Sequence, residues 1–311
     1  MVRRQGLKQT ANFTEEAVGL VLESYLTILG FPFRGYSIEP FSTSKERWVG
    51  ADARLRRGIK GITPFYMQFK RPEAYPCESR AKIVADRKSL GLETAHKSLF
   101  FPLRKKQVDH FDYQHNILFR LRRRLTALNI GDAAYICPVF LELTNYREQM
   151  FKIALGRFFN PLKSLPWDFD DVGIIEPTGA IHFDRVALFK EHVSIPPHTH
   201  VQSANHFYSF SEDGNQLCFH SPSSLPDGTM SLAQFLDYLW KGFLDRGAAV
   251  HMENADMTLK SLIKGTLGPQ AGELFLELPF QDDPLGNWNE WGSFLKNVFS
   301  IDQFVLIEWQ L

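Results

Sequence analysis

Three polar side chains near the start of the chain could hold a metal ion and act on a phosphate. Asp52 ends a Gly-Ala-Asp tripeptide, and Gln68 and Lys70 lie on either side of Phe69. Carboxylate and amide oxygens are ligands that a hard cation such as Mg²⁺ accepts. An ammonium group beside them can steady an attacking water or the charge that grows on a phosphate. These residue types therefore predict cleavage of a phosphodiester bond.

Two strands are expected to position these side chains. Side chains of a strand point to alternate faces, so residues two apart share a face. In 51–56 and 65–70 the apolar residues take one phase, which leaves Asp52, Gln68 and Lys70 in the polar phase. The residues between the two strands include two glycines and a proline, which favours an antiparallel hairpin. In such a hairpin the three side chains would meet on one patch.

A helix upstream of the strands contributes an acid. Asn12 followed three residues later by Glu15 is typical of a helix start, and the apolar residues of 18–29 recur at helical spacing. Gly19 and Glu23 are four residues apart, so they share a helix face. Because Gly19 has no side chain, the sequence places Glu23 where a backbone or a hydrated ion can approach.

These motifs, in this order, resemble the PD-(D/E)xK nuclease superfamily, the fold of restriction endonucleases and Holliday-junction resolvases. Its core runs α-β-β-β-α-β, with an acid on the first helix, an Asp on the second strand and an acid-x-Lys motif on the third. Glu23, Asp52 and Lys70 match these positions in the first half of the chain. Gln68 stands where the family usually has Glu or Asp. Gln-x-Lys variants are known in the family, but one negative charge is lost.

The resemblance implies a metal-dependent nuclease, an endonuclease in particular, that hydrolyses DNA. It assigns Mg²⁺, with Mn²⁺ as a substitute, to Asp52, Gln68, the Phe69 carbonyl and Glu23, and it gives Lys70 the task of orienting the attacking water. RNA stays open as a second substrate. Nuclease domains joined to unfamiliar second domains often serve microbial defence, so the expected role is defence against foreign DNA in the cytoplasm.

Two other functions stay open. A nuclease-like fold can serve only for binding, as an inactive subunit of a larger nucleic-acid complex, and the amide at Gln68 favours this alternative. The third alternative is a scaffold without a nucleic-acid role. A Gly-x-Asp tripeptide is also ordinary turn chemistry, and a lysine at a strand end is also an ordinary solvated residue, which would explain Asp52 and Lys70 without a metal.

The charge of the chain is divided unevenly between its halves. The formal net charge is zero, yet residues 1–150 hold 25 Lys and Arg against 15 Asp and Glu, and the remaining residues hold 10 against 20. A basic half suits DNA, and an acidic half could contact a protein partner. The expected nucleic-acid contacts are Arg54, Arg56, Arg57, Lys60, Arg104, Lys105, Lys106, Arg120, Arg123 and Arg124.

A later helix adds an accessory residue. Phe111, Gln114, Leu118, Leu121 and Leu125 follow the spacing of one buried helix face, with Arg120, Arg123 and Arg124 on the exposed side. Gln114 interrupts this apolar stripe. It lies either at the margin of the core or, as the family resemblance implies for the helix after the motif lysine, toward the active site.

The pattern of elements predicts an α/β (α+β) protein. Residues 1–150 are expected to form a restriction-endonuclease-like mixed sheet flanked by helices, and residues 151–311 an additional α+β domain, with the boundary in 145–170. The later strands could instead extend the first sheet. The later elements expected are hairpins at 172–183 and 205–220, helices at 231–245 and 288–299, and a final strand at 304–309.

Other chemistry finds less support. The three cysteines are far apart and in no C-x-x-C arrangement, which argues against disulfides and a cysteine-based zinc site. His192, His198, His200 and His206 lie within fifteen residues, but in a proline-rich segment without helical ligand spacing. No apolar run is long enough to cross a bilayer, so no membrane partner is expected, and a homo-oligomer is compatible with the sequence.

Overall fold

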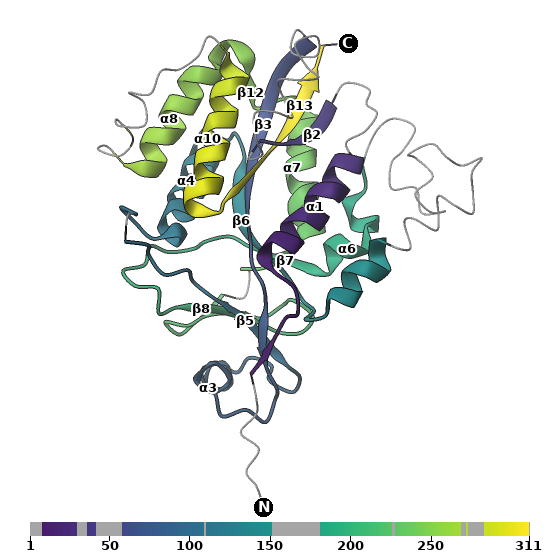
Figure 1. Ribbon diagram of the computed structural model, residues 1–311, viewed down its shortest axis with the longest axis vertical. Coiled ribbons are helices and arrows are strands. Elements are labelled where there is room, and N and C mark those ends of the chain that lie inside the picture. The colour runs from purple at the N-terminus through teal and green to yellow at the C-terminus, as the bar shows by residue number, and fades with distance from the viewer. Residues whose placement is uncertain are drawn as a thin grey trace, which may run out of the picture.

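The computed structural model describes residues 8–29, 36–41, 58–108, 110–150, 181–225, 228–268, 272 and 283–310, and it shows a mixed α+β protein with two sheets (Figure 1). In the described residues the larger sheet has the strand order β11-β7-β6-β3-β13-β2, and β12 pairs with one end of β3. Its strands are β2 (Tyr36–Pro40), β3 (Ile59–Phe69), β6 (Asp132–Pro138), β7 (His192–Ile195), β11 (Met230–Ser231), β12 (Val250–His251) and β13 (Asp302–Trp309).

Strand β3 is the centre of this sheet. It runs antiparallel to β13 and parallel to β6. Its side chains are buried on both faces, with the exception of Lys60, because helices cover the sheet on either side. Phe65, Met67 and Phe69 point to one face and Tyr66 to the other, as the predicted alternation requires. Lys70 follows directly at the end of the strand.

The predicted turn at 57–64 is wrong for residues 59–64, which belong to β3. Gly61 is needed there for close approach, since a Cβ on it would lie 2.6 Å from the Val250 carbonyl oxygen of β12. A Cβ on Gly131 would lie 1.8 Å from the Pro64 carbonyl oxygen, so that carbonyl faces the β6 side. In a strand the N–H of a residue points the same way as its carbonyl. A residue other than proline at position 64 would therefore direct its N–H into the gap between β12 and β6.

The C-terminal strand β13 lies between β2 and β3, where it pairs Phe304 with Pro40 on one side and with Phe65 on the other. The sequence predicts this strand but not its position. In the structure β13 is the antiparallel neighbour of β3 from Ile59 to Met67, and β6 borders the other edge of β3 from Phe65 to Phe69. Residues 51–56 themselves lie outside the described residues.

Strands from both sides of the predicted domain boundary share the larger sheet. Strands β2, β3 and β6 precede the boundary, and β7, β11, β12 and β13 follow it. Most of the boundary segment 145–170 lies outside the part of the chain that the structure describes. The described residues therefore do not divide into one sheet for each predicted half.

Helices cover both faces of the larger sheet (Figure 1). One face packs against α4, α8 and α10, and the other against α1, α6 and α7. Their bounds are α1 (Glu15–Leu29), α4 (Gln114–Leu128), α6 (Ala187–Lys190), α7 (Leu232–Arg246), α8 (Ala255–Leu267) and α10 (Pro284–Phe299). The helices expected at 18–29, 231–245 and 288–299 are confirmed, and the one expected at 111–125 is confirmed from Gln114 onward. Among the described helices, none is long and apolar enough to cross a membrane.

The smaller sheet is antiparallel throughout, in the order β1-β4-β5-β8-β9-β10. The predicted hairpin at 205–220 is confirmed as β8 and β9, whereas the one at 172–183 falls mostly outside the described residues. The strands are β1 (Gln9–Thr10), β4 (Glu73–Tyr75), β5 (Ser98–Pro102), β8 (Phe207–Phe210), β9 (Leu217–Phe219) and β10 (Ser223–Leu225), and the short helix α3 (Lys82–Ser89) follows β4.

Candidate functional site

Lys70 lies where β3, α1 and α4 meet. Its backbone N–H donates to the Ile136 carbonyl at 2.8 Å, which continues the pairing of β3 with β6. Its Nζ lies 3.7 Å from Glu15 Oε1 and 3.5 Å from Gln114 Oε1. The structure thus brings together two of the predicted site residues, Lys70 and Gln114, and adds an acid, Glu15, that the sequence assigned to a helix cap.

The ammonium of Lys70 is held in a poorly solvated place. Burial lowers the pKa of Lys70, Glu15 raises it only in part, and the charge of Arg104 lowers it further. The Nζ atom also lies 5.8 Å from the centre of the Tyr135 ring. A further anion beside this buried lysine, such as a phosphate oxygen, would offset the effect of burial and favour the charged ammonium.

Glu15 reaches Lys70 because α1 crosses the end of β3 at Gly19. A Cβ on Gly19 would lie 3.0 Å from Phe69 Cδ2, so the helix backbone rests directly on this ring. Glu15 is one turn before Gly19 on the same helix face. Glu23 is one turn after Gly19, about 12 Å from Glu15 along the helix axis at 1.5 Å per residue. The acid that pairs with Lys70 is therefore Glu15, whereas Glu23, predicted as a ligand of the metal ion, lies two turns farther along α1.

The start of α1 differs from the prediction for a local reason. Thr14 Oγ1 accepts a hydrogen bond from the Ala17 N–H at 3.2 Å, so Thr14 acts as the cap. The Asn12 side chain instead joins the helix entry to a distant loop, since it donates to Glu142 at 2.6 Å and accepts from the Leu143 N–H at 2.6 Å. Glu15 is consequently free of the capping-box role that the Asn12 spacing suggested.

Gln68 is buried beside Lys70, on the face of the sheet that α4 and α10 cover. It is 1% exposed, and neither of its amide atoms has a hydrogen-bond partner within the described residues. The same holds for both amide atoms of Gln303, which lies opposite Tyr66 on β13. A buried amide without partners costs about 1 to 3 kcal/mol. Such orphaned oxygens are available for a water or a cation.

Sequence reasoning missed Gln303, although a signal for it exists. Gln303 is two residues from Ile301 and from Val305, which are both buried in the core on the same face. It is therefore a polar residue in the apolar phase of its strand, and it is buried like Gln68 of β3. What the sequence lacks is any sign that the last strand lies next to β3.

The described oxygen donors fit a hard cation in kind but not in number. Glu15 offers a carboxylate and Gln68 an amide oxygen, whereas Mg²⁺ and Ca²⁺ take at least six oxygen ligands, water included. In the part of the chain that the structure describes, no group of three or more His, Cys, Asp or Glu could hold a metal ion. Asp52 lies outside the described residues. Asp302, the strand acid across from Met67, has both carboxylate oxygens within 2.8 Å of Lys296 Nζ.

Several of the expected nucleic-acid contacts have structural partners. Arg120 donates from Nε to the Thr266 carbonyl at 2.6 Å and pairs through Nη1 with Asp112 at 2.5 Å. Arg124 donates to Ser261 Oγ, so these two arginines join α4 to α8 instead of lying on an exposed side. Phe111, expected in the buried stripe, precedes the helix and is 46% exposed.

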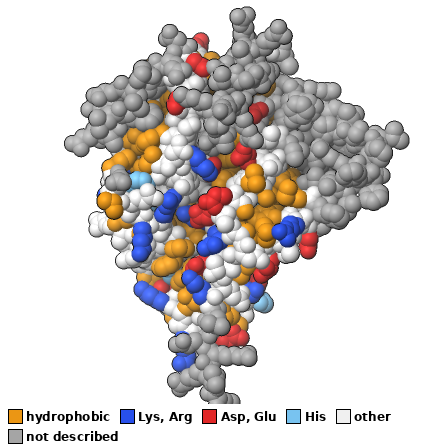
Figure 2. Space-filling model, in the orientation of Figure 1, with side chains coloured by type: hydrophobic (Ala, Val, Ile, Leu, Met, Phe, Trp, Pro, Cys, Tyr) orange, Lys and Arg blue, Asp and Glu red, His pale blue; other side chains and the backbone are white. Residues whose placement is uncertain are grey.

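The other basic candidates are dispersed. Lys60 pairs with Glu308 at 2.6 Å, at the end of β3 away from Lys70. Arg104 is exposed and donates to Ser300 Oγ at 2.6 Å, and Lys105, Lys106 and Arg123 are exposed as well. Figure 2 shows one face of the molecule, on which Lys and Arg are interspersed with Asp and Glu. Arg54, Arg56 and Arg57 lie outside the described residues.

The histidines of 192–206 do not form one cluster of hydrogen bonds. His192 Nε2 lies 2.8 Å from the Tyr146 hydroxyl, His198 Nδ1 lies 2.8 Å from the Tyr208 hydroxyl, and His206 Nδ1 lies 2.9 Å from Ser221 Oγ. Three of the four rings are thus hydrogen-bonded to different side chains and do not share a ligand.

Comparisons with protein-family models, with curated proteins and with solved structures find no match for this chain.

Proposed function

We propose that this chain is a metal-dependent nuclease of PD-(D/E)xK type, with its active centre at the end of β3. The observation that carries the proposal is the placement of Lys70. Its buried ammonium lies between the Glu15 carboxylate and the Gln114 amide, next to the orphaned amide of Gln68. Such a cation at the end of a central strand suits the charge of a phosphodiester.

The order of elements supports the same proposal. Among the larger sheet and its helices α1 comes first, and β3, α4 and β6 come later in the order of the third strand, second helix and fourth strand of the family core, with β4, α3 and β5 between β3 and α4. The departure is the strand between β2 and β3, since β13 occupies that place. We therefore propose a restriction-endonuclease-like fold in which the C-terminal strand β13 lies beside β3, the strand that carries Gln68 and leads to Lys70.

Each side chain has a role in this proposal. Lys70 orients the attacking water and balances the charge on the phosphate, and Gln114 holds the ammonium through its amide oxygen. Glu15, Gln68 and Asp52 would hold the metal ion. When bound, Mg²⁺ or Mn²⁺ would supply Lewis-acid activation of water and neutralise the developing negative charge. DNA is the proposed substrate and RNA the second, with a role in cytoplasmic defence against foreign DNA.

A second candidate function is nucleic-acid binding without cleavage. It is favoured by Gln68, which replaces a carboxylate and is 1% exposed. In this alternative Lys70 and Gln114 belong to a retained but inactive site, and the acidic half of the chain contacts a protein partner.

A plasmid-nicking assay separates the two functions. The wild-type chain is incubated with supercoiled plasmid in Mg²⁺, in Mn²⁺ and in EDTA, and DNA affinity is measured in parallel at several salt concentrations. The nuclease proposal predicts nicking that requires the divalent ion and ceases in EDTA. DNA affinity that falls with salt, without nicking in either ion, would establish the binding function instead. An absence of both would contradict both proposals.

A further inference from the structure

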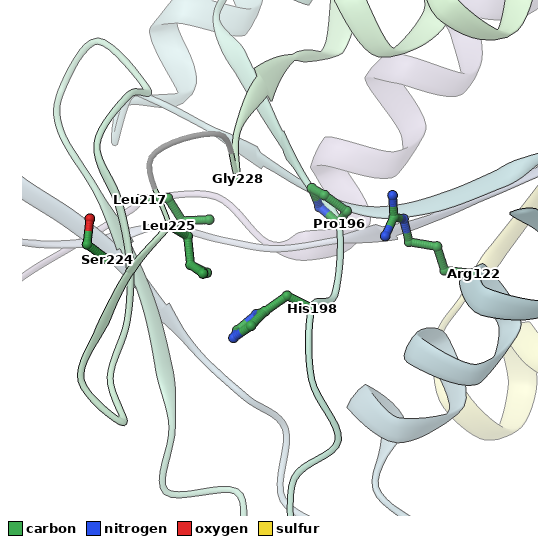
Figure 3. Close-up of a pocket in the computed structure, with 7 residues that line it drawn as sticks. All are labelled: Arg122, Pro196, His198, Leu217, Ser224, Leu225 and Gly228. Atoms are coloured by element: carbon green, nitrogen blue, oxygen red, sulfur yellow. The ribbon is translucent and has the colours of Figure 1, made fainter.

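The cavity beside the smaller sheet has polar groups that do not converge (Figure 3). It has a volume of about 270 Å³, and its polar lining comes from Arg122, His198 and Ser224. Figure 3 shows the His198 ring extending away from Arg122. Ser224 and Leu225 are successive residues of β10, so their side chains lie on opposite faces of that strand. The cations and the aromatic ring near Lys70, in contrast, belong to one short segment.

This segment lies between β5 and α4 and forms a rim of the proposed active centre. It comprises residues 104–108, 110 and 111, and we call it the rim segment. The ring of Phe111 has its centre 5.7 Å from that of Phe299, the last residue of α10. The Phe299 carbonyl accepts a hydrogen bond from Gln114 Nε2, and Gln114 Oε1 lies 3.5 Å from Lys70 Nζ. Phe111 is therefore linked to the buried ammonium through two residues only.

The other end of the rim segment is held at the same place. Arg104 Nη1 donates to the hydroxyl of Ser300, which directly follows α10, at 2.6 Å. The charge of Arg104 lowers the pKa of Lys70, as expected of a cation close to that ammonium. Within the rim segment, Lys106 Nζ donates to the Phe111 carbonyl at 3.2 Å. Both ends of the segment are thus fixed beside the C-terminal end of α10.

The rim segment exposes cations and an aromatic ring together. The three consecutive cations of 104–106 are exposed, and Phe111 is 46% exposed although its side chain is large and apolar. The acid that follows, Asp112, pairs with Arg120 of α4 at 2.5 Å. Its charge is therefore balanced by that arginine and leaves the cations of the rim segment available for another anion.

Cations next to an exposed aromatic ring are the combination that binds single-stranded nucleic acid. Lys and Arg contact the phosphates, and the ring stacks on a base. In a duplex each base is already stacked and paired, so a surface ring stacks on it only where the strand is unpaired. We propose that the rim segment binds an unpaired stretch of DNA beside Lys70, with Phe111 stacked on a base and Arg104 on a phosphate. This assignment rests on the proposed function and names the form of DNA that the active centre takes.

Fluorescence anisotropy on the full chain tests the proposal with a labelled single strand of DNA and with the same strand annealed to its complement. EDTA is present throughout, so that no strand is cut. Phe111→Leu removes the ring but keeps an apolar side chain next to Phe299, and Phe111→Trp keeps a ring. Tyr238→Leu, which removes an aromatic side chain that is 61% exposed on α7, is the matched control. Thermal melting of each variant shows whether it is folded.

Arg104→Gln tests the phosphate contact through the salt dependence of binding. Loss of one phosphate contact to a single strand should lower the slope of log affinity against log salt concentration by about 0.7. Arg246→Gln is the matched control and should leave this slope unchanged. Arg246 is exposed at the end of α7, two residues before Ala248, whose N–H donates to Glu308 at the opposite end of β3 from Lys70.

The wild-type chain is expected to bind the single strand at least about tenfold more tightly than the duplex. Phe111→Leu should weaken single-strand binding by at least about fivefold, as loss of one stacked base would do, whereas Phe111→Trp and the Tyr238→Leu control should bind like wild type. The proposal is overturned if the wild type does not bind the single strand at micromolar concentration, if the duplex binds equally well, if a folded Phe111→Leu variant binds unchanged, or if Arg104→Gln keeps the wild-type salt slope.

These measurements do not depend on cleavage, because EDTA removes the divalent ion. Nicking of plasmid in Mg²⁺ together with equal affinity for single strand and duplex would contradict the role of the rim segment and leave the nuclease proposal intact. Preferential binding of the single strand through Phe111, without nicking in either ion, would contradict the nuclease proposal and support the role of the rim segment.

Discussion

Gly19 of α1 lies against the ring of Phe69, the residue between Gln68 and Lys70. A Cβ at Gly19 would lie 3.0 Å from Phe69 Cδ2 and 3.1 Å from Cε2. This contact sets the height of the helix above the strand, and it thereby brings Glu15, one turn earlier, to 3.7 Å from the Lys70 ammonium.

Substitution of Gly19 by valine should disturb this arrangement. The added side chain would overlap the Phe69 ring, so we expect a loss of about 1 to 3 kcal/mol in the free energy of unfolding, measured by urea denaturation. Leu20→Val is the matched control, since Leu20 is 66% exposed on the same helix and should cost less than about 1 kcal/mol. Equal stability of the Gly19→Val variant and wild type would show that the helix is not held at this distance.

Glu15 should matter more for activity than Glu23. Glu15→Gln removes the carboxylate beside Lys70, and we expect nicking to slow by at least about tenfold. Glu23→Gln should slow it less, because Glu23 lies about 12 Å farther along the helix. Glu253→Gln, at an exposed position, controls for the loss of one negative charge. A larger effect at Glu23 than at Glu15 would restore the assignment made from the Gly-x-x-x-Glu spacing.

Acid should destabilise the fold through His192 and His115. His192 donates from Nδ1 to the Leu188 carbonyl and accepts from the Tyr146 hydroxyl, and His115 lies in the same way between the Thr199 carbonyl and the Tyr135 hydroxyl. Burial lowers the pKa of each to about 4, against about 6.5 in the unfolded chain. Their contribution is thus complete above pH of about 6.5 and is lost as the pH falls toward 4.

Urea denaturation at two pH values measures this effect. Between pH of about 7 and about 5, each of these histidines should account for a loss of about 2 kcal/mol. His192→Gln cannot titrate there, so its stability should fall by about 2 kcal/mol less over the same interval, whatever its stability at neutral pH. An unchanged pH dependence in that variant would mean that His192 is protonated in the folded state.

Arg120 is expected to stabilise the packing of α4 on α8. Arg120→Gln breaks the ion pair with Asp112 and the bond to the Thr266 carbonyl, and it should cost about 1 to 3 kcal/mol in urea denaturation. Arg123→Gln, at the exposed position on the same helix, should change stability by less than about 0.5 kcal/mol. Equal effects of the two substitutions would argue against a structural role for Arg120.

Periodicity predicts the helices well because each buries one face against the sheet. The apolar spacing of 18–29 recovers α1, and that of 111–125 recovers α4 from Gln114 onward, together with the unusual glutamine that contacts Lys70. Gln114 could be noticed because it breaks an apolar stripe. Its partner could be anticipated only through the resemblance, since Lys70 is 44 residues away.

Pairing between distant strands is what the sequence does not reveal. Gly61 and Pro64 indicate a turn when only the local sequence is considered. In the structure Gly61 allows β12 to approach β3, and Pro64 lies at the gap between β12 and β6. The neighbour of β3 is β13, from the other end of the chain. Glu15 was overlooked for a similar reason: its spacing from Gly19 equals that of Glu23, and only the direction in which α1 crosses Phe69 distinguishes the two.

The most direct test of the proposed active centre is the rate of Mg²⁺-dependent plasmid nicking by Lys70→Met. Methionine has about the length of the apolar stem of lysine but lacks the ammonium, and Lys241→Met, at an exposed position on α7, is the matched control. We predict that Lys70→Met nicks at least about 100-fold more slowly than wild type while remaining folded, and that Lys241→Met nicks at the wild-type rate. Wild-type nicking by a folded Lys70→Met variant would contradict the assignment of the active centre to the end of β3.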